Sequence, residues 1–423
     1  MESVWKVRDA HEYARIRKDD LIRGGPTMAT YETIKQKLET NKQEQLLHFY
    51  EQLNEEEQRD LLNQIEQIDF DQLETANQKD EENARITALP SHTTEMFSPE
   101  ELTKMREHGC SLIADGKVAI VLLAGGQGTR LGHDGPKGTV NMDGSPETSL
   151  FALQAKRIQA LQHEMNTTLP WYIMTSPIND DATKAFFHDN QYFGLNRDQV
   201  TFFQQEVSPA LTPDGKVMLA DKATVFQAPN GNGGVFASMQ KAGILAKLQS
   251  TNIKWIFFNN IDNALVQVAD PLFIGYTDQQ GADISSKSVK KADPGEKVGV
   301  LGQRNGKPSV IEYSELTEEQ RQQPELQDAN IGIHLFKVDF LEQTANRVLP
   351  YHFAHKKIAT IDEQGVAVHP AEPNGYKLEK FYFDVFPYAS KMSIFQVDRA
   401  NEFLPVKNKT GKDSLEEAQE RFN

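Results

Sequence analysis

The spacing of hydrophobic residues changes near position 118. Between residues 28 and 75, apolar residues recur every three or four positions, which is typical of amphipathic helices. From Val118 onward, short β-branched and aromatic runs alternate with helical patterns. We expect strands at 118–124, 171–175, 200–204, 254–259 and 332–337, and helices at 148–165, 180–188 and 235–249. This alternation predicts an α/β fold with a mainly parallel sheet covered by helices on both faces.

The same patterns divide the chain into four segments. Asn305-Gly306 lies between two apolar runs and predicts a β-hairpin across 298–313. A second methionine, Met28, suggests that the residues before it are an upstream extension or an artificial addition. The predicted segments are this extension at 1–27, a helical N-terminal lobe with a linker at 28–100, a central α/β domain at 101–375, and C-terminal strands with a polar tail at 376–423.

Composition and charge exclude several classes of protein. The chain has 423 residues, one cysteine and a formal net charge of −16. A single cysteine cannot form an intramolecular disulfide framework or a cysteine-based metal site, so we expect a reducing compartment. The acidic balance argues against general binding to nucleic acid or an anionic membrane. We find neither an apolar run of membrane-spanning length nor a signal peptide, and therefore expect a cytoplasmic protein.

The most informative segment is LLAGGQGTRLGHDGPKG at 122–138. A buried-type strand leads directly into Gly125, Gly126 and Gly128, and Arg130 and Lys137 follow in the same segment. Glycines allow a backbone to approach a ligand closely, and the N–H groups of such a loop can point at phosphate oxygens. The two cations add fixed positive charge. This pattern predicts a phosphate-binding loop.

Two common phosphate-binding loops do not fit this segment. A dinucleotide fingerprint needs a third glycine where Leu131 stands. A P-loop needs its lysine after the last glycine, whereas Lys137 precedes Gly138. A tight turn without a ligand is the plainer interpretation, but it does not require three glycines and two cations.

The segment GGQGTRLG, with Pro136-Lys137 downstream, resembles the signature of sugar-nucleotide pyrophosphorylases. It is most similar to the eukaryotic-type UDP-N-acetylhexosamine pyrophosphorylases and their uridylyltransferase relatives. The resemblance extends from about residue 30 to 410 and includes short motifs in the family's order: Trp171–Ser176, Phe202–Gln205, Gly231–Gly234, Asp262-Asn263, Glu312–Glu315, Asn330-Ile331, Asn374-Gly375 and Phe381–Asp384. It implies a Rossmann-like, GT-A-like mixed sheet flanked by helices, with a helical N-terminal lobe and a small C-terminal subdomain.

The resemblance also implies a reaction, namely transfer of UMP from UTP to a sugar 1-phosphate with release of pyrophosphate. N-acetylglucosamine 1-phosphate is the expected acceptor, and Mg²⁺ or Mn²⁺ the expected cofactor. The attacking phosphate oxygen is already an anion, so the enzyme must supply positive charge and alignment rather than a nucleophile. UTP and the sugar 1-phosphate are then the expected binding partners, and we expect a monomer or weak homo-oligomer. The resemblance makes 101–375 the expected catalytic domain.

Two aspartates are candidate metal ligands. Asp262 ends the apolar run WIFFNNID, which places a carboxylate where α/β folds bind their ligands, at the carboxyl edge of the sheet. Mg²⁺ prefers oxygen ligands and keeps several waters, so one or two carboxylates suffice. Asp384 lies among aromatic residues in FYFDVF, where a carboxylate needs a cation or a hydrogen-bond partner. Turn capping is the alternative role for Asp262.

The remaining candidates come from matching positions of the family. The resemblance implies catalytic cations at Arg130, Lys137 and Lys391, nucleotide contacts at Gly125, Gly126, Gly128, Gln205 and Gly233, and sugar or phosphate contacts at Asn232, Glu312, Asn330 and Lys377. An amide such as Gln205 can bind the uracil edge. A lone lysine is more often a solvated surface group. Glu312 could instead be a charge on a strand surface, and Asn330 could simply cap a strand.

Several alternative functions remain at this stage. Asn330 suits an N-acetyl group but does not require one, so glucose or galactose 1-phosphate stays open as the acceptor. A non-catalytic UDP-sugar sensor could use the same scaffold. A glycosyltransferase would commonly carry an Asp-x-Asp motif, whereas this chain has Asn260-Ile261-Asp262. Leu131 in the glycine loop argues against a nicotinamide-dependent oxidoreductase.

Overall fold

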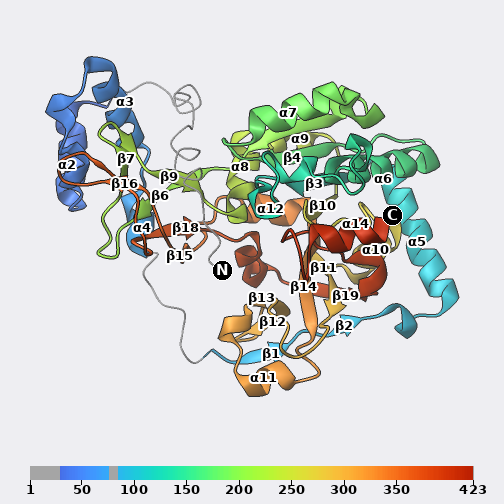
Figure 1. Cartoon of the computed structure of the whole chain (residues 1–423). Coiled ribbons are helices and arrows are strands. Elements are labelled where there is room, and N and C mark those ends of the chain that lie inside the picture. Colours follow the sequence, from blue (N-terminus) through green and yellow to red (C-terminus); the bar gives the residue numbers. More distant parts are fainter. Residues whose placement is uncertain (1–28, 76–83, 423) are drawn as a thin grey trace. The chain divides into compact units, whose positions relative to one another are not determined.

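The computed structural model describes residues 29–75 and 84–422, so the prediction for 1–27 lies outside the described residues. The chain forms two compact units (Figure 1). The smaller unit combines the described residues up to 75 with Gln205–Gly234 and Val348–Phe381. The larger unit holds the rest. The predicted segment boundaries therefore differ from the observed ones, because two later segments join the N-terminal lobe.

The larger unit is built on an 11-stranded sheet. Along its main path the strands follow the order β2 (Ser91–His92), β19 (Met392–Val397), β11 (Ile284–Lys290), β14 (Asp328–Lys337), β10 (Trp255–Asn260), β3 (Val118–Leu123), β4 (Trp171–Thr175) and β5 (Val200–Gln204). Only β14 runs antiparallel to its neighbours on this path. The predicted mixed sheet is confirmed, and β3, β4, β5 and β10 all end at the same edge.

The predicted hairpin is confirmed in the same sheet. Strands β12 (Val300–Arg304) and β13 (Lys307–Ile311) pair antiparallel, and β1 (Ile86–Ala88) pairs with β12. Asn305 and Gly306 both have positive φ, 51° and 80°. Positive φ at both central positions characterises the tight turns whose twist matches that of paired strands. The short helix α11 (Glu318–Gln322) follows the hairpin.

Helices cover both faces of the sheet. Met105 of α5 (Pro99–Ala114), Phe151 of α6 (Leu150–Met165) and Phe273 of α10 (Pro271–Gln280) share one core with alternate residues of β3. On the other face, Phe236 of α8 (Val235–Lys241) contacts Phe258 and Phe336. The remaining helices of this unit are α7 (Asp180–Asp189), α9 (Ile244–Ser250), α12 (Val338–Thr344), α13 (Arg399–Glu402) and α14 (Leu415–Phe422). Every residue of β3 is buried, as expected for a strand covered on both faces.

Two helix predictions need correction. The helix expected at 235–249 divides into α8 and α9, because Gly243 has a φ of 70° and caps the start of α9. The segment interpreted as a linker up to residue 100 already contains the start of α5. Ser98 caps that helix, Glu101 completes a capping box, and Pro99 occupies its first turn, which is a favoured position for proline.

The smaller unit confirms the helical N-terminal pattern. Helices α2 (Tyr31–Thr40), α3 (Glu55–Glu66) and α4 (Phe70–Thr75) bury the apolar positions at three- and four-residue spacing, including Leu38 and Leu61. They pack with Leu211 and Leu378, which come from distant strands. The four-stranded sheet of this unit has the order β15 (His352–Lys356), β18 (Gly375–Glu379), β6 (Val207–Leu211) and β9 (Gln227–Pro229). Leu211 belongs to β6 and Leu378 to β18. Two short strand pairs complete the unit, namely β7 (Leu219–Asp221) with β8 (Thr224–Val225), and β16 (Thr360–Ile361) with β17 (Ala367–Val368).

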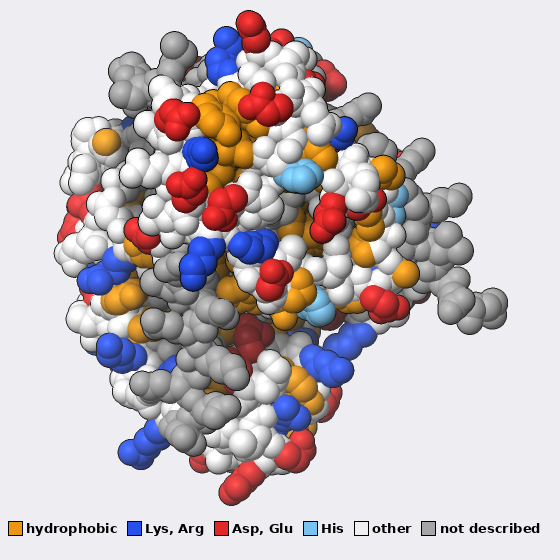
Figure 2. Space-filling model, turned by 90° about the vertical axis from the view of Figure 1, so that its left-hand side faces the viewer, with side chains coloured by type: hydrophobic (Ala, Val, Ile, Leu, Met, Phe, Trp, Pro, Cys, Tyr) orange, Lys and Arg blue, Asp and Glu red, His pale blue; other side chains and the backbone are white. Residues whose placement is uncertain are grey.

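The C-terminal residues do not form a separate subdomain, contrary to the prediction for 376–423. Strand β19 pairs in parallel with β11 along its full length, and Ala418 of α14 is buried in the core of the larger unit. In the described part of the chain, no helix has the length and apolar character needed to cross a membrane. Figure 2 shows Lys and Arg side chains interspersed with Asp and Glu on one face, without a continuous acidic field there.

Candidate active site

The glycine loop leaves the carboxyl end of β3 and is anchored on both sides. The N–H of Ile261, just past β10, donates to the carbonyl of Leu123 at 3.1 Å. The side-chain amide of Asn179 donates to the carbonyls of Ala124 and Gly126 at 3.0 and 3.2 Å. The loop is therefore fixed beside the segment that follows β10, which carries Asp262.

The glycines of this loop occupy their positions for different physical reasons. A Cβ on Gly128 would lie 2.8 Å from the His133 ring, and one on Gly138 would lie 2.1 Å from Phe151, so packing requires both glycines. A Cβ on Gly126 would meet no atom within 4 Å, and Gly126 is exposed. The backbone around Gly126 is thus the part of the loop that a ligand can approach.

A buried cation and a carboxylate lie beside this loop. Lys137, on the short helix η6 (Lys137–Thr139), places its Nζ 3.9 Å from Oδ2 of Asp262, and the two side chains are 16% and 24% exposed. Burial lowers the pKa of Lys137, Asp262 opposes this effect, and the positive charges of Lys407 and Arg130 lower the pKa further. The structure therefore places Lys137 beside Asp262, with the charges of Lys407 and Arg130 near enough to act on Lys137.

Sequence analysis missed Lys407. The N–H of Val406 donates to the carbonyl of Asp262 at 2.8 Å, and Pro405 forms a β-bridge with Asn263. These backbone contacts bring the segment before α14 alongside the end of β10. Nothing in the local sequence indicated this, because Lys407 lies in a polar stretch without a glycine loop or an apolar strand beside it.

The structure does not bring Lys391 to this site, so that prediction is corrected. Lys391 immediately precedes β19, and the register pairs Met392 with Ile284, the first residue of β11. It therefore lies at the amino edge of the sheet, opposite the glycine loop. Its Nζ donates to the carbonyl of Gln280. The prediction assumed a strand around Asp384, whereas that residue belongs to the 3₁₀ helix η12 (Tyr382–Tyr388).

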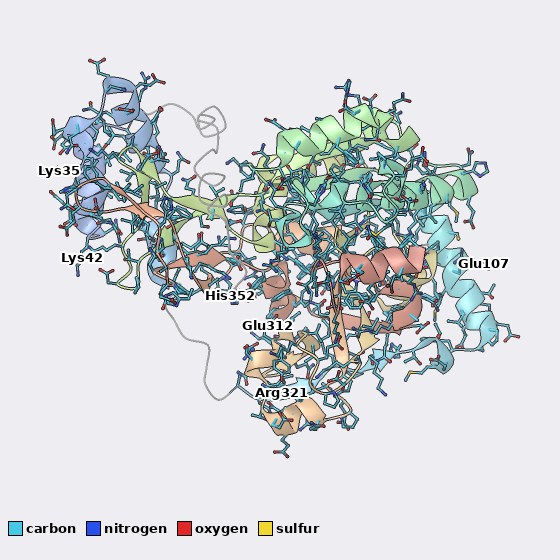
Figure 3. All side chains as sticks on the ribbon, viewed as in Figure 1. Lys35, Lys42, Glu107, Glu312, Arg321 and His352 are labelled. Carbon is cyan, nitrogen blue, oxygen red and sulfur yellow. The ribbon has the colours of Figure 1, made fainter. Side chains whose placement is uncertain are left out.

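A second cluster forms around Asn330 in β14. The backbone N–H of Asn330 donates to the carbonyl of Gly299 at 2.8 Å, and its Oδ1 accepts from the N–H of Gly332 at 3.0 Å. A Cβ on Gly299 would lie 3.1 Å from Oε1 of Glu312, which follows β13 (Figure 3). The structure thus brings both predicted sugar-facing residues next to Gly299, where a side chain would collide with Val310 at 2.8 Å and with Glu312.

Tyr382 is a buried residue of η12, and burial raises the pKa of its hydroxyl. The hydroxyl lies 2.8 Å from Nε2 of His334 in β14. Asp384 lies two residues further along η12 and is half-buried.

The donor set suits a hard metal ion with water ligands. Within residues 29–75 and 84–422, no group of three or more His, Cys, Asp or Glu side chains is arranged to hold a metal. Asp262 offers partly exposed carboxylate oxygens. Mg²⁺ is commonly bound by one or two carboxylates together with waters and substrate phosphates, so the residues present fit this ion.

Four predicted residues belong to the smaller unit, namely Gln205, Asn232, Gly233 and Lys377. Gly233 lies in η10 (Asn232–Gly234), and its N–H donates to the carbonyl of Lys380 at 2.8 Å. A Cβ there would lie 2.6 Å from the Lys380 carbonyl carbon, so packing explains this glycine. Lys377 pairs with Glu379 at 3.0 Å. The ligand roles of these four residues, and of the half-buried Gly125, stay predictions.

Comparison with known proteins identifies close relatives. The profile of the family described as UTP–glucose-1-phosphate uridylyltransferase matches residues 63–416. The chain is 37% identical over 417 residues to UDP-N-acetylglucosamine diphosphorylase 2 of Arabidopsis thaliana, covering 91% of this chain and 82% of the relative. It is 36% identical to the UDP-N-acetylglucosamine pyrophosphorylase of Saccharomyces cerevisiae, covering 87% and 84%. The crystal structure of the uridine diphosphate N-acetylglucosamine pyrophosphorylase from Trypanosoma brucei is similar with a TM-score of 0.78 at 31% identity, covering 94% and 84%.

Proposed function

Since the chain belongs to the UTP–glucose-1-phosphate uridylyltransferase family, we propose that it transfers UMP from UTP to N-acetylglucosamine 1-phosphate. The products are UDP-N-acetylglucosamine and pyrophosphate. The relatives that cover most of the chain are named for N-acetylglucosamine, which favours this acceptor over glucose or galactose 1-phosphate. The observation that carries the proposal is the Lys137–Asp262 pair, 3.9 Å apart beside an open glycine backbone and influenced by the charges of Arg130 and Lys407.

The reaction suits a site that supplies charge rather than a nucleophile. An oxygen of the sugar phosphate forms a bond with the α-phosphorus of UTP. The bond from that phosphorus to the oxygen leading to the β-phosphorus breaks, and pyrophosphate leaves with its electron pair. No proton has to move. The three cations lower the repulsion between the two polyanions and stabilise the charge that develops on the leaving group.

Asp262 is the residue proposed to hold Mg²⁺, with Asp384 as a second candidate ligand. When bound, this ion would neutralise phosphate charge and help to align the reacting groups. Lys137 remains close to Asp262 and limits the local negative charge. Gly126 offers its backbone to the nucleotide phosphates.

Asn330 and Glu312 are proposed to bind the sugar. A carboxylate accepts hydrogen bonds from sugar hydroxyls, and an amide N–H can donate to the carbonyl of an acetamido group. Gly299 accepts a hydrogen bond from the backbone N–H of Asn330 and packs closely against Glu312, so it holds both residues in one place. A cytoplasmic location and a monomeric or weakly oligomeric state remain proposals.

Pyrophosphate release tests the proposed function. The purified chain is incubated with UTP, Mg²⁺ and either N-acetylglucosamine, N-acetylgalactosamine, glucose or galactose 1-phosphate. We expect the highest kcat/KM with N-acetylglucosamine 1-phosphate. A higher kcat/KM with glucose or galactose 1-phosphate would identify that sugar phosphate as the acceptor instead. Tight binding of UDP-sugar without turnover under any of these conditions would favour the sensor.

A further inference from the structure

The glycine loop encloses the imidazole ring of His133. The ring fills the space that two glycines leave: a Cβ on Gly128 would lie 2.8 Å from its Cδ2, and one on Gly135 would lie 3.3 Å from its Nε2. The backbone closes around the same point, since the N–H of Gly128 donates to the carbonyl of Gly135 at 2.9 Å and the N–H of His133 donates to the carbonyl of Gly128 at 3.2 Å. His133 is half-buried and therefore packs as part of the loop.

A hydrogen bond from this ring reaches the short helix that carries Lys137. Nε2 of His133 lies 2.7 Å from Oγ1 of Thr139, the last residue of η6. The Thr139 hydroxyl donates its only proton to the carbonyl of Pro136 at 2.8 Å, so it accepts from His133, and the ring carries a proton on Nε2. These two bonds connect the tip of the loop with Pro136 and Thr139, between which Lys137 lies.

The start of the loop is tied to the same helix. The N–H of Lys137 donates to the carbonyl of Gly126 at 3.0 Å, and Gln127 forms a β-bridge with Pro136. Gly126 offers the open backbone of the proposed phosphate site, and Lys137 is the cation of that site beside Asp262. Both groups therefore belong to one cross-linked loop, which the hydrogen bond between His133 and Thr139 closes at its far end.

We propose that His133 and Thr139 are positioning residues, which hold the glycine loop closed so that the Gly126 backbone and the Lys137 ammonium meet the phosphates of UTP together. This inference rests on the proposed function, because it concerns the nucleotide of that reaction. A loop with six glycines between residues 125 and 138 has many accessible conformations, and without the cross-link the binding of UTP would have to order it. The cross-link supplies this order before the nucleotide binds.

The net contribution of one hydrogen bond sets the size of the expected effect. Its loss corresponds to a fall in kcat/KM for UTP of about three- to tenfold. The KM for N-acetylglucosamine 1-phosphate should change by less than about twofold, because Asn330 and Glu312, the residues proposed to bind the sugar, lie outside the loop. A general loss of folded protein would instead lower the apparent kcat and leave both KM values unchanged.

The first experiment compares Thr139→Val with Thr139→Ser and Thr103→Val in the full chain. Thr103→Val is the matched control, because the Thr103 hydroxyl also donates to a proline carbonyl, that of Pro99, at 2.8 Å. We expect kcat/KM for UTP to fall only in Thr139→Val. Serine retains the hydroxyl, so Thr139→Ser should stay within about twofold of the unmodified chain. The proposal would be overturned if Thr139→Val behaved like Thr103→Val, or if Thr139→Ser lost as much activity as Thr139→Val.

The second experiment changes the other partner of the same bond. His133→Phe keeps a ring against Gly128 but removes the Nε2 proton. His108→Phe is its control, because His108 is also half-buried and its Nε2 lies 2.8 Å from Oδ2 of Asp278. Only His133→Phe should lower kcat/KM for UTP, and combining it with Thr139→Val should give no more than the larger single loss, since both changes break one bond. A combined loss equal to the product of the single losses would show that the two residues act separately and would refute the proposal.

A third readout needs no substrate. Amide hydrogen exchange of residues 125–139, followed by mass spectrometry after proteolysis, reports the backbone hydrogen bonds that Gly128 and Lys137 donate. Exchange in this segment should be faster in His133→Phe than in the unmodified chain, and unchanged in His108→Phe. Equal exchange in all three proteins would overturn the proposed closure. If the unmodified chain released no pyrophosphate, the proposed function would fail, while this measurement would still decide whether His133 closes the loop.

Discussion

Replacement of Lys407 by alanine tests the cation that only the folded chain brings to the proposed phosphate site. Two opposite unit charges about 4 Å apart attract by about 4 kcal/mol at an effective dielectric constant of about 20. Lys407 is exposed, so solvent screening reduces its effect, and we take about half of that value. A loss of about 2 kcal/mol in transition-state stabilisation corresponds to a fall in kcat/KM of about thirtyfold.

The pH profile adds a second signature of the same substitution. Lys137 must be protonated to attract phosphate, so activity is lost as the pH rises through its pKa. Burial and the charges of Lys407 and Arg130 hold that pKa below its ordinary value. Removal of Lys407 removes one lowering influence, and the pKa of Lys137 rises. The alkaline limb of kcat/KM, which reports the free enzyme, should therefore move to higher pH in Lys407→Ala.

The assay is initial-rate pyrophosphate release across a pH series, with Lys412→Ala as the matched control. Lys412 lies in the same segment but is 61% exposed and pairs with Glu296 at 3.5 Å. This control should keep the activity and pH profile of the unmodified chain. The reasoning would be refuted if Lys407→Ala retained both near-normal kcat/KM and an unmoved alkaline limb while remaining folded. A loss of activity equal to that of Lys412→Ala would also refute it.

Three further predictions concern single residues of the larger unit. Asp262→Ala should lower turnover by more than tenfold without unfolding the protein; near-normal Mg²⁺-dependent activity would contradict its metal role. Gly275→Ala should lower the free energy of unfolding by about 1–3 kcal/mol in urea titrations, because its Cβ would lie 1.7 Å from a carbonyl oxygen of α5; unchanged stability would show that the helices separate easily. Lys287→Met should lower the free energy of unfolding by about 3–5 kcal/mol in the same titration, because the buried ammonium forms ion pairs with Asp270 and Glu402 at 2.7 and 2.5 Å. A decrease below about 1 kcal/mol would mean that these carboxylates find other partners.

Strand β11 shows why part of the fold could not be predicted from the sequence. Its residues ISSKSVK are mostly polar, yet all except the last are buried. Each polar side chain has a partner from a distant segment: Ser286 meets His334, Lys287 meets two carboxylates, and Ser288 donates to Asp328 at 2.6 Å. A hydropathy pattern treats such residues as exposed, because the partners that make their burial tolerable are invisible along the chain. The apolar strands β3, β4, β5 and β10 carry no such ambiguity and were predicted within one or two residues.

The same distinction explains which site residues the sequence revealed. The glycine loop and Asp262 each follow a buried strand directly, so local sequence marks them, and the parallel sheet places both strand ends at one edge. Lys407 reaches that edge through the backbone contacts of the segment before α14, and no local pattern separates Lys407 from Lys391. Charge alone therefore cannot tell which of the two lysines lies near the glycine loop. The backbone hydrogen bond from Val406 to Asp262 decides this, because it fixes the segment that carries Lys407 beside the carboxylate.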